Sequence, residues 1–315
     1  MLYNYSLGGD LMENVVVRGR YLKRRNDLVD SFFELSYTNT HLLYLAMYKA
    51  QQEDKLEIVI SEQELREELV YVPNYRFNEC IYEFAATITE TEFYVRDYDT
   101  KYSIIKLIEK SQYNKKDKKL TVVFKPQIKE YLFDLKENNY TLLDIDILKN
   151  KKKGQKINKS NFEIKGLEYF KSRYDYFNEE TLYITIKKEF FMSRLLPFNN
   201  TDKVKKAFLE GTGQREALLS ALNLLMPDSH PYLWAAFRKN YLLNILNYIN
   251  DNSGLQVEYK PMRQSLQVNA IMVKIQSDDY YTDNSKGRKF NDEEEIFMKM
   301  AEREFTTVVR HPKDE

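Results

Sequence analysis

The residues best suited to chemistry lie in one stretch, between positions 232 and 276. Its first half has the apolar spacing of a helix, and the polar face of that helix carries Lys239, Asn240, Asn244 and Asn247. An asparagine amide can bond both polar atoms of an adenine edge, and a lysine can hold a phosphate or read a guanine. Because asparagine is a poor helix former, this face costs stability unless something uses it.

Two further sets of polar residues lie beside that face. Arg238 falls on the apolar side of the helix, so its charged head would have to extend out to water or phosphate. Two alternating strands follow, at 255–259 and 267–275, joined by a polar and basic loop. The candidate DNA contacts of this half are Arg238, Lys239, Asn240, Asn244, Asn247, Lys260, Arg263 and Gln264. A second interpretation stays open, in which this is only a solvated face of a chain rich in Asn and Lys.

The elements around this stretch follow the order of a winged helix. The pattern predicts a helix at 162–174, a strand at 181–187, a short helix at 189–196, the helix at 232–249, and then the hairpin. An apolar helical insertion, 199–229, separates the last two helices. Helix, strand, helix, helix and hairpin is the winged-helix order.

The first half shows the same order. A helix at 36–52 is capped by Ser36 or Thr38, and a strand at 56–60 runs into a capping box formed by Ser61 and Glu64. A helix follows to about residue 70, then a third helix at 75–89, strands at 92–98 and 102–109, a basic turn at 115–119 and a strand at 120–124. The sequence therefore predicts an α+β fold of two tandem winged-helix domains related by internal duplication.

This organisation predicts three regions. An N-terminal winged-helix domain spans 1–140 and includes a bridge helix at 126–136, for dimer or DNA-backbone contact. A C-terminal winged-helix domain spans 141–277, contains the insertion 199–229 and reads DNA. An acidic tail with a short amphipathic helix spans 278–315.

The third helix of the first half is less suited to a DNA groove than its counterpart. Its outward face carries Glu79 and Glu83 beside Arg76, and carboxylates repel phosphate, although one could accept a hydrogen bond from a cytosine amine. Contact with the DNA backbone and contact with a second copy remain alternatives. The candidate contacts of this half are Arg76, Lys115, Lys116 and Lys118. A further basic cluster could touch phosphate or be a solvated segment, and it comprises Arg18, Arg20, Lys23, Arg24 and Arg25.

Composition narrows the classes of function. The 315 residues carry a net charge of +0, so a nucleic-acid surface must be a local patch. Cys80 is the single cysteine, which excludes an internal disulfide framework and a cysteine zinc cluster. No window approaches eighteen apolar residues and no signal peptide is evident, so we expect a soluble, cytoplasmic protein.

Catalytic chemistry is weakly represented. The histidines at 41, 230 and 311 form no pair at metal-ligand spacing, and Gly211-Thr212-Gly213 lacks the rest of a phosphate-binding loop. We therefore expect no enzyme activity, catalytic residue, metal or cofactor. One rival is a Mg²⁺-dependent endonuclease using Asp144, Asp146, Glu163 and Lys165, the loose acid-then-ExK pattern of some nucleases. Such spacing arises easily in a chain that is 30% charged.

Three stretches carry a family resemblance. The first runs from Arg25-Asn26-Asp27-Leu28 to Leu42-Leu43-Tyr44-Leu45-Ala46, and the second from Val123-Phe124-Lys125-Pro126 to Tyr140-Thr141. The third runs from Tyr232 to Pro261 and includes Ile249-Asn250, and a weaker one spans residues 159–168. Together they resemble the iteron-binding plasmid replication initiators, proteins of two winged-helix domains. The insertion 199–229 is longer than the family pattern.

The resemblance implies a function and partners. Members of that family bind direct repeats of double-stranded DNA at a plasmid origin as monomers, help to open an AT-rich segment and recruit host replication proteins. Dimers joined through the N-terminal domain repress their own promoter. We therefore expect a homodimer in equilibrium with a monomer, and no membrane partner. A dimeric winged-helix repressor of transcription would present similar surfaces and stays an alternative.

Overall fold

The computed structural model describes most of both halves of the chain. The described residues are 20–31, 33–96, 102–135, 140–150, 161–177, 180–195, 202, 206, 233–264, 267–277, 295 and 298–302. Residues 151–160 lie outside them, and so does the insertion 199–229 except for residues 202 and 206. Arg18 is outside them as well.

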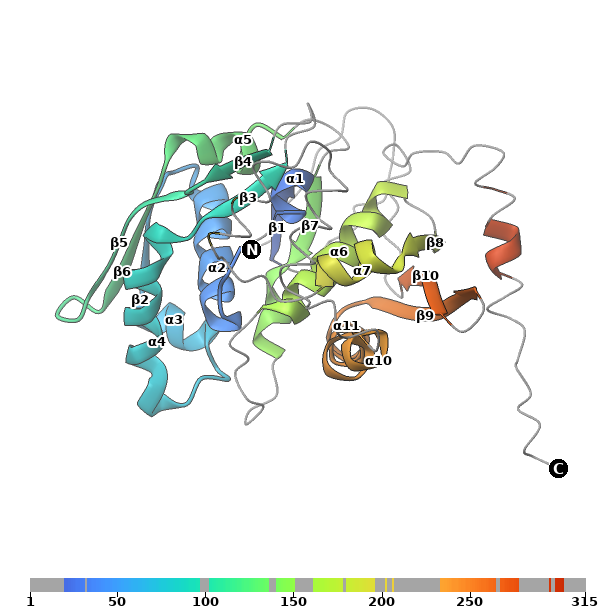
Figure 1. Cartoon of the computed structure of the whole chain (residues 1–315). Coiled ribbons are helices and arrows are strands. Elements are labelled where there is room, and N and C mark those ends of the chain that lie inside the picture. Colours follow the sequence, from blue (N-terminus) through green and yellow to red (C-terminus); the bar gives the residue numbers. More distant parts are fainter. Residues whose placement is uncertain are drawn as a thin grey trace, which may run out of the picture.

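The first winged-helix unit is built from six elements in the left part of Figure 1. They are α2 (Tyr37–Glu53), β2 (Glu57–Ser61), α3 (Glu62–Glu68), α4 (Asn74–Thr87), β5 (Ile108–Asn114) and β6 (Lys119–Phe124). The strands form an antiparallel three-stranded sheet in the order β2-β6-β5.

Local sequence signals set the helix ends of this unit. Ser36 caps α2 by accepting a hydrogen bond from the backbone N–H of Asn39. Ser61 and Glu64 form the expected capping box at the start of α3. The stripe of α4 faces the core, since Phe77, Ile81 and Phe84 are buried, and Ile88 in the turn that follows is buried too.

The second winged-helix unit repeats this plan. Its elements are α6 (Phe162–Phe177), β8 (Thr181–Lys187), α7 (Lys188–Leu195), α10 (Leu233–Phe237), the π-turn η4 (Arg238–Leu242), α11 (Leu243–Asn252), β9 (Leu255–Gln264) and β10 (Gln267–Ser277). The sheet order is β8-β10-β9, so in both units the strand after the first helix pairs with the last strand of the unit. The predicted α+β fold of two winged helices is confirmed.

Several further elements lie outside the two three-stranded sheets. Strand β1 (Tyr21–Arg25) pairs with β7 (Tyr140–Asp144), and α1 (Asn26–Val29) follows β1. Strands β3 (Phe93–Arg96) and β4 (Tyr102–Ile105) form a separate antiparallel pair. The 3-10 turn η1 (Ile88–Glu90) follows α4, and the 3-10 turn η3 (Ile145–Asn150) follows β7. Thus the expected strand 102–109 is divided between β4 and β5, which belong to different sheets.

The predicted bridge helix at 126–136 is shorter in the structure. It consists of a 3-10 turn, η2 (Pro126–Ile128), and α5 (Lys129–Leu132), after which the Phe133 and Asp134 N–H groups both bond the carbonyl of Lys129. The predicted domain boundary at 140 coincides with the first residue of β7, which pairs with Arg25. The placement of the boundary stays a prediction.

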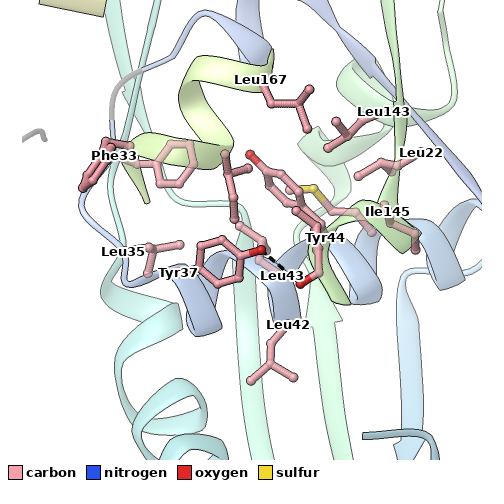
Figure 2. Packing of buried hydrophobic residues seen from close by; sticks show 14 of the residues in the cluster. Leu22, Phe33, Leu35, Tyr37, Leu42, Leu43, Tyr44, Leu143, Ile145 and Leu167 are labelled. Carbon is pink, nitrogen blue, oxygen red and sulfur yellow. Dashed lines mark hydrogen bonds between the residues drawn. The ribbon is translucent and has the colours of Figure 1, made fainter. Parts of the chain in front are cut away.

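One hydrophobic core runs through both units. Tyr44 of α2 extends toward Leu143 of β7 and Leu167 of α6, and Tyr37 of α2 lies near Leu35, as Figure 2 shows. In the C-terminal region, Met298 and the buried Ala301 pack against Tyr183 and Met272 on the second sheet. Among the described residues, no helix is both long and apolar enough to cross a membrane.

Candidate nucleic-acid interface

The polar face predicted in the second unit lies on a continuous helix with one irregular turn. α10, η4 and α11 follow one another without a break from Leu233 to Asn252. The π-turn η4 inserts an extra residue into the helical repeat, so Phe237 and Leu242, five positions apart, are both buried. In this wider turn three consecutive residues, Arg238, Lys239 and Asn240, are exposed to solvent.

The inner face of this helix is held closely against α6. Phe237, Ile245 and Ile249 are at most 2% exposed. Gly166 of α6 makes room for this approach, because a Cβ atom at Gly166 would overlap the Cγ2 atom of Ile245. The buried face therefore fixes which way the polar face points.

The polar face has the expected residues in exposed positions. Lys239, Asn240, Asn244 and Asn247 are all exposed. The Asn244 amide donates one hydrogen bond to the backbone carbonyl of Asn240, over 2.9 Å. That bond uses one of the two amide hydrogens, so the other hydrogen and the carbonyl oxygen remain suited to a base edge.

Arg238 differs from the sequence prediction. Its helix position had placed it on the apolar side, but the π-turn brings it to an exposed position. Its Nε donates a hydrogen bond to the Tyr259 hydroxyl over 2.7 Å, and Tyr259 also packs edge-on against Trp234. Arg238 therefore ties the helix to β9 while its charge stays in contact with solvent.

The wing residues belong to a strand instead of a loop. Lys260, Arg263 and Gln264 lie in β9, which continues to residue 264 and pairs with β10 as far as Gln264 opposite Gln267. The predicted end at Tyr259 was wrong because Pro261 is tolerated here: β9 is an edge strand, where proline can occupy a position that needs no N–H bond. The connection at 265–266 lies outside the described residues.

The side chains of this wing are accessible. Arg263 and Gln264 are exposed and Lys260 is half-buried. The Gln264 side-chain oxygen accepts a hydrogen bond from Asn269 over 2.8 Å. Asn269 is an exposed polar neighbour that the sequence interpretation missed, because strand alternation alone does not distinguish it from any solvated residue.

The first unit presents a basic wing beside a mixed helix. Lys115, Lys116 and Lys118 are exposed in the turn between β5 and β6, and so is Lys119 at the start of β6. The Asn114 side chain accepts hydrogen bonds from the N–H groups of Lys116 and Asp117, which orders the turn. Lys118 has a left-handed φ of 53°.

On α4, Arg76 is already engaged. Its Nε lies 3.5 Å from Glu79, and Glu83 is exposed on the same helix. The outward face also shows Tyr75, which is 85% exposed, and Tyr82. Carboxylates and aromatic rings dominate this face, so the first unit presents its positive charge mainly on the wing.

The basic cluster near the N-terminal end is structural where the structure describes it. Arg20 bonds Glu68 through two nitrogens, at 2.7 and 2.8 Å, and bonds Asp146 as well. Arg25 pairs with Asp27. Arg20 and Arg25 each have an acidic partner within the fold, which favours a structural role for them, and phosphate contact by this cluster stays a prediction.

Arg24 is the most deeply buried member of that cluster. It is 2% exposed, pairs with the buried Glu168 of α6 and stacks 4.2 Å from the Tyr44 ring centre. Burial lowers the pKa of the Arg24 guanidinium, and contact with Tyr44 opposes that effect. Alternation along β1 had already placed Leu22 and Arg24 on one face, which was the available signal.

The residues of the nuclease alternative are not assembled for metal binding. Asp146 is paired with Arg20 and Lys149, and the Lys165 amino group donates to the backbone carbonyl of Ser31 over 2.9 Å. Burial lowers the pKa of Lys165 well below its usual value. Within the described part of the chain, no three His, Cys, Asp or Glu side chains are grouped to hold a metal ion.

Comparison with known proteins gives a family match and a fold match. Residues 21–154 match the family described as initiator replication protein, WH1. No curated protein matches the chain. The crystal structure of the Pi initiator protein in complex with iteron DNA is 13% identical, has a TM-score of 0.60, and aligns over 84% of this chain and 100% of that chain.

Two structures of RctB domains 2 and 3 also align. The selenomethionine derivative is 13% identical, covers 83% of this chain and 92% of its own, and has a TM-score of 0.39. The second, of residues 155–483, is 11% identical, covers 83% of each chain and has a TM-score of 0.35. Of these three structures, the Pi structure has the TM-score that supports a shared fold, and it aligns over 84% of this chain.

Proposed function

Since residues 21–154 match the family described as initiator replication protein, WH1, we propose that this chain is a plasmid replication initiator that binds direct repeats at an origin. The observation that carries the proposal is the exposed face of Lys239, Asn240, Asn244 and Asn247 beside a long two-stranded wing. The Pi initiator, which has the same fold, was crystallised in complex with iteron DNA, and this supports DNA as the partner.

In this proposal the two units have different tasks. The second unit supplies most of the base reading, through its asparagines and Arg263. The exposed lysines of both wings supply affinity that depends on salt, because each phosphate they neutralise releases a counterion. α4 of the first unit contributes backbone contact or contact with a second copy, since Glu79 and Glu83 disfavour a position deep in a groove.

The later steps of initiation are part of the same proposal. Binding to several repeats would bend the origin, help to open an AT-rich segment and recruit host replication proteins in the cytoplasm. A dimer in equilibrium with the monomer would repress the protein's own promoter. The chain acts by binding, without a cofactor, in every one of these steps.

A mobility-shift series tests the proposal. The full chain is titrated against the DNA upstream of its gene and against random DNA of equal length, at increasing salt. A ladder of discrete complexes on direct repeats that survives moderate salt is the expected result. Weak binding to both DNAs that vanishes with salt would contradict it, and a single complex on an inverted repeat would favour a dimeric repressor.

A further inference from the structure

The helix from Leu233 to Asn252, which carries the proposed base-reading face and is called the reading helix below, is anchored to both units. Ile245 packs against Gly166 of α6 within its own unit. One turn further along, Tyr248 reaches α2 of the first unit, where its hydroxyl lies 2.9 Å from the hydroxyl of Tyr37. Both tyrosines are buried, with exposures of 8% and 0%.

The hydroxyl pair is part of a directional network. The Tyr37 hydroxyl also lies 3.0 Å from the carbonyl of Leu148 in η3, and that of Tyr248 lies 3.4 Å from the carbonyl of Ile147. A chain in which Tyr248 donates to Tyr37 and Tyr37 donates to Leu148 uses each proton once. The two rings meet edge to face, with centroids 6.2 Å apart and an interplanar angle of 85°.

This network differs in kind from the apolar packing around it. A hydrogen bond constrains both the distance and the angle between its two groups, whereas apolar attraction has no preferred direction. Tyr248 is adjacent to Asn247 and one turn from Asn244, so a shift of α11 at this point moves both exposed amides. A tyrosine hydroxyl that is buried without a hydrogen-bond partner would also cost free energy. This cost favours the one position of α11 in which the two hydroxyls meet.

Other contacts hold α6 to the first unit near the same place. The Tyr44 hydroxyl donates to Glu168 over 2.7 Å, and the Asn161 amide donates to the Thr40 hydroxyl over 3.1 Å. These bonds anchor α6, and α11 rests on α6. The tyrosine pair is then a direct contact from α2 of the first unit to the reading helix itself.

We infer that Tyr37 and Tyr248 are positioning residues, which hold α11 at one angle to the first unit so that both units meet DNA in a single relative orientation. The inference rests on the proposed function for its consequence on DNA, but its structural claim concerns the protein alone. Each claim therefore has its own measurement.

The first measurement is the distance between the units without DNA. Spin labels at Glu83→Cys on α4 and Asn247→Cys on α11, both exposed positions, are placed in a Cys80→Ala background. Pulsed electron spin resonance should give one narrow distance distribution for the parent and a broader or shifted one for Tyr37→Phe and for Tyr248→Phe. Tyr113→Phe is the matched control, because its hydroxyl bonds Glu62 within the first unit.

The second measurement is of DNA binding by the unlabelled full-length chain. It uses a repeat DNA on which the parent protein protects two separate segments from cleavage in a footprinting experiment. Inserting one or two base pairs between the segments should weaken parent binding. Each Tyr→Phe variant should bind the natural spacing about threefold to tenfold more weakly, the range expected for one hydrogen bond. It should also lose much of the parent's sensitivity to the insertion, which a general loss of stability would not produce.

The outcomes separate the two claims. Unchanged distance distributions in both Tyr→Phe variants, with melting temperatures equal to the parent's, would overturn the positioning role. Failure of the parent to bind any repeat DNA would overturn the proposed function, and the distance measurement would still decide the structural claim. A variant that melts early is compared with Tyr113→Phe at a temperature where both are folded.

Discussion

Lys239 and Asn240 are adjacent and exposed, yet their chemistry suits different parts of a DNA duplex. Lysine interacts with phosphate as a point charge, whereas an asparagine amide distinguishes bases through a donor and an acceptor held in one plane. Asn244 keeps one amide hydrogen and its carbonyl oxygen for a base edge, because its other amide hydrogen donates to the carbonyl of Asn240. We therefore expect Lys239 to contribute to affinity for any DNA and the asparagines to contribute to specificity for particular bases.

Lys239→Ala should weaken binding to repeat and random DNA alike and reduce the salt slope by about one. Asn240→Ala should reduce discrimination at one base position by about 1–3 kcal/mol, with little change on random DNA. Salt-dependent titrations on both DNAs measure these effects. Lys55→Ala, at an exposed lysine between α2 and β2, is the control for loss of charge, and equal losses on both DNAs for all variants would contradict the division.

Glu68 shows how buried charge links the protein's stability to pH. Burial alone would raise the pKa of this carboxyl, but contacts with His41 and with the two nitrogens of Arg20 outweigh it and lower the pKa to about 2. A carboxyl whose pKa is depressed in the folded state stabilises it fully above the unfolded pKa, which is about 4.5. This contribution is lost as pH falls from that value towards 2.

The free energy of unfolding of the parent should therefore fall between about pH 5 and pH 2, and Glu68→Gln should remove part of that pH dependence. Urea titrations across this range measure the slope, so a lower absolute stability of the variant does not obscure the result. Glu67→Gln changes an exposed neighbour and should keep the parent slope. Identical slopes in all three proteins would show that Glu68 is not the titrating group.

At the scale of elements, the packing of α6 against α11 decides where the reading helix lies. Gly166 is the position that allows this approach, because a side chain there would overlap Ile245. Isoleucine is branched at Cβ and has few rotamers in a helix, so it cannot turn aside cheaply. The glycine is thus needed for packing, despite the cost of a flexible residue inside a helix.

Gly166→Ala should destabilise the protein by about 1–3 kcal/mol through overpacking, although alanine favours the helix itself. Adding Ile245→Ala should recover part of that loss, because the overlapping methyl group is removed. Urea unfolding of both single variants and the double variant gives the coupling energy. Additive losses would show that the two residues do not meet.

Phe237 and Trp234 lie on the same helix but differ in burial. Phe237 is 2% exposed within the core, whereas Trp234 is half-buried and packs on Phe237 and Tyr259. Phe237→Ala should cost about 3–5 kcal/mol, and Trp234→Ala should cost less because part of its ring already contacts solvent. Thermal and urea unfolding rank the two, and the ratio of repeat to random binding should stay at the parent value in both.

At the scale of the whole molecule, one core and a buried charge pair join the two units. Arg24 on β1 and Glu168 on α6 form an ion pair that is almost fully buried, and Lys165 also donates to the backbone of the first unit. Removing one partner of such a pair leaves an uncompensated buried charge, which is strongly destabilising. The units are therefore expected to unfold together.

Trp234, the single tryptophan, lies in the second unit and its fluorescence reports on that unit alone. Its unfolding curve in urea should coincide with far-UV circular dichroism, which reports on the whole chain. Arg24→Ala, a change on β1, should shift both curves equally, by about 3–5 kcal/mol. Two separated transitions, or a fluorescence curve that ignores Arg24→Ala, would contradict a shared core.

The sequence by itself determined most elements of the two winged-helix units and their order, because these depend on local signals. Capping at Ser36 and Ser61, the stripe from Phe77 to Ile88 and the alternation of β8 all act over a few residues. The repeated order of elements also indicated the duplication, and both sheets have the same strand order. The exposed asparagines of the reading helix followed from the same helical periodicity.

Only the tertiary structure decided how side chains distant in sequence are paired. Arg20 and Arg24 read as a basic surface until Glu68 and Glu168, 48 and 144 positions away, are folded against them. The π-turn that exposes Arg238 and the contact between Tyr37 and Tyr248 likewise depend on neighbours that local periodicity does not specify. Buried charge and helix register are set by what surrounds them, and those surroundings exist only once both units have packed on a single core.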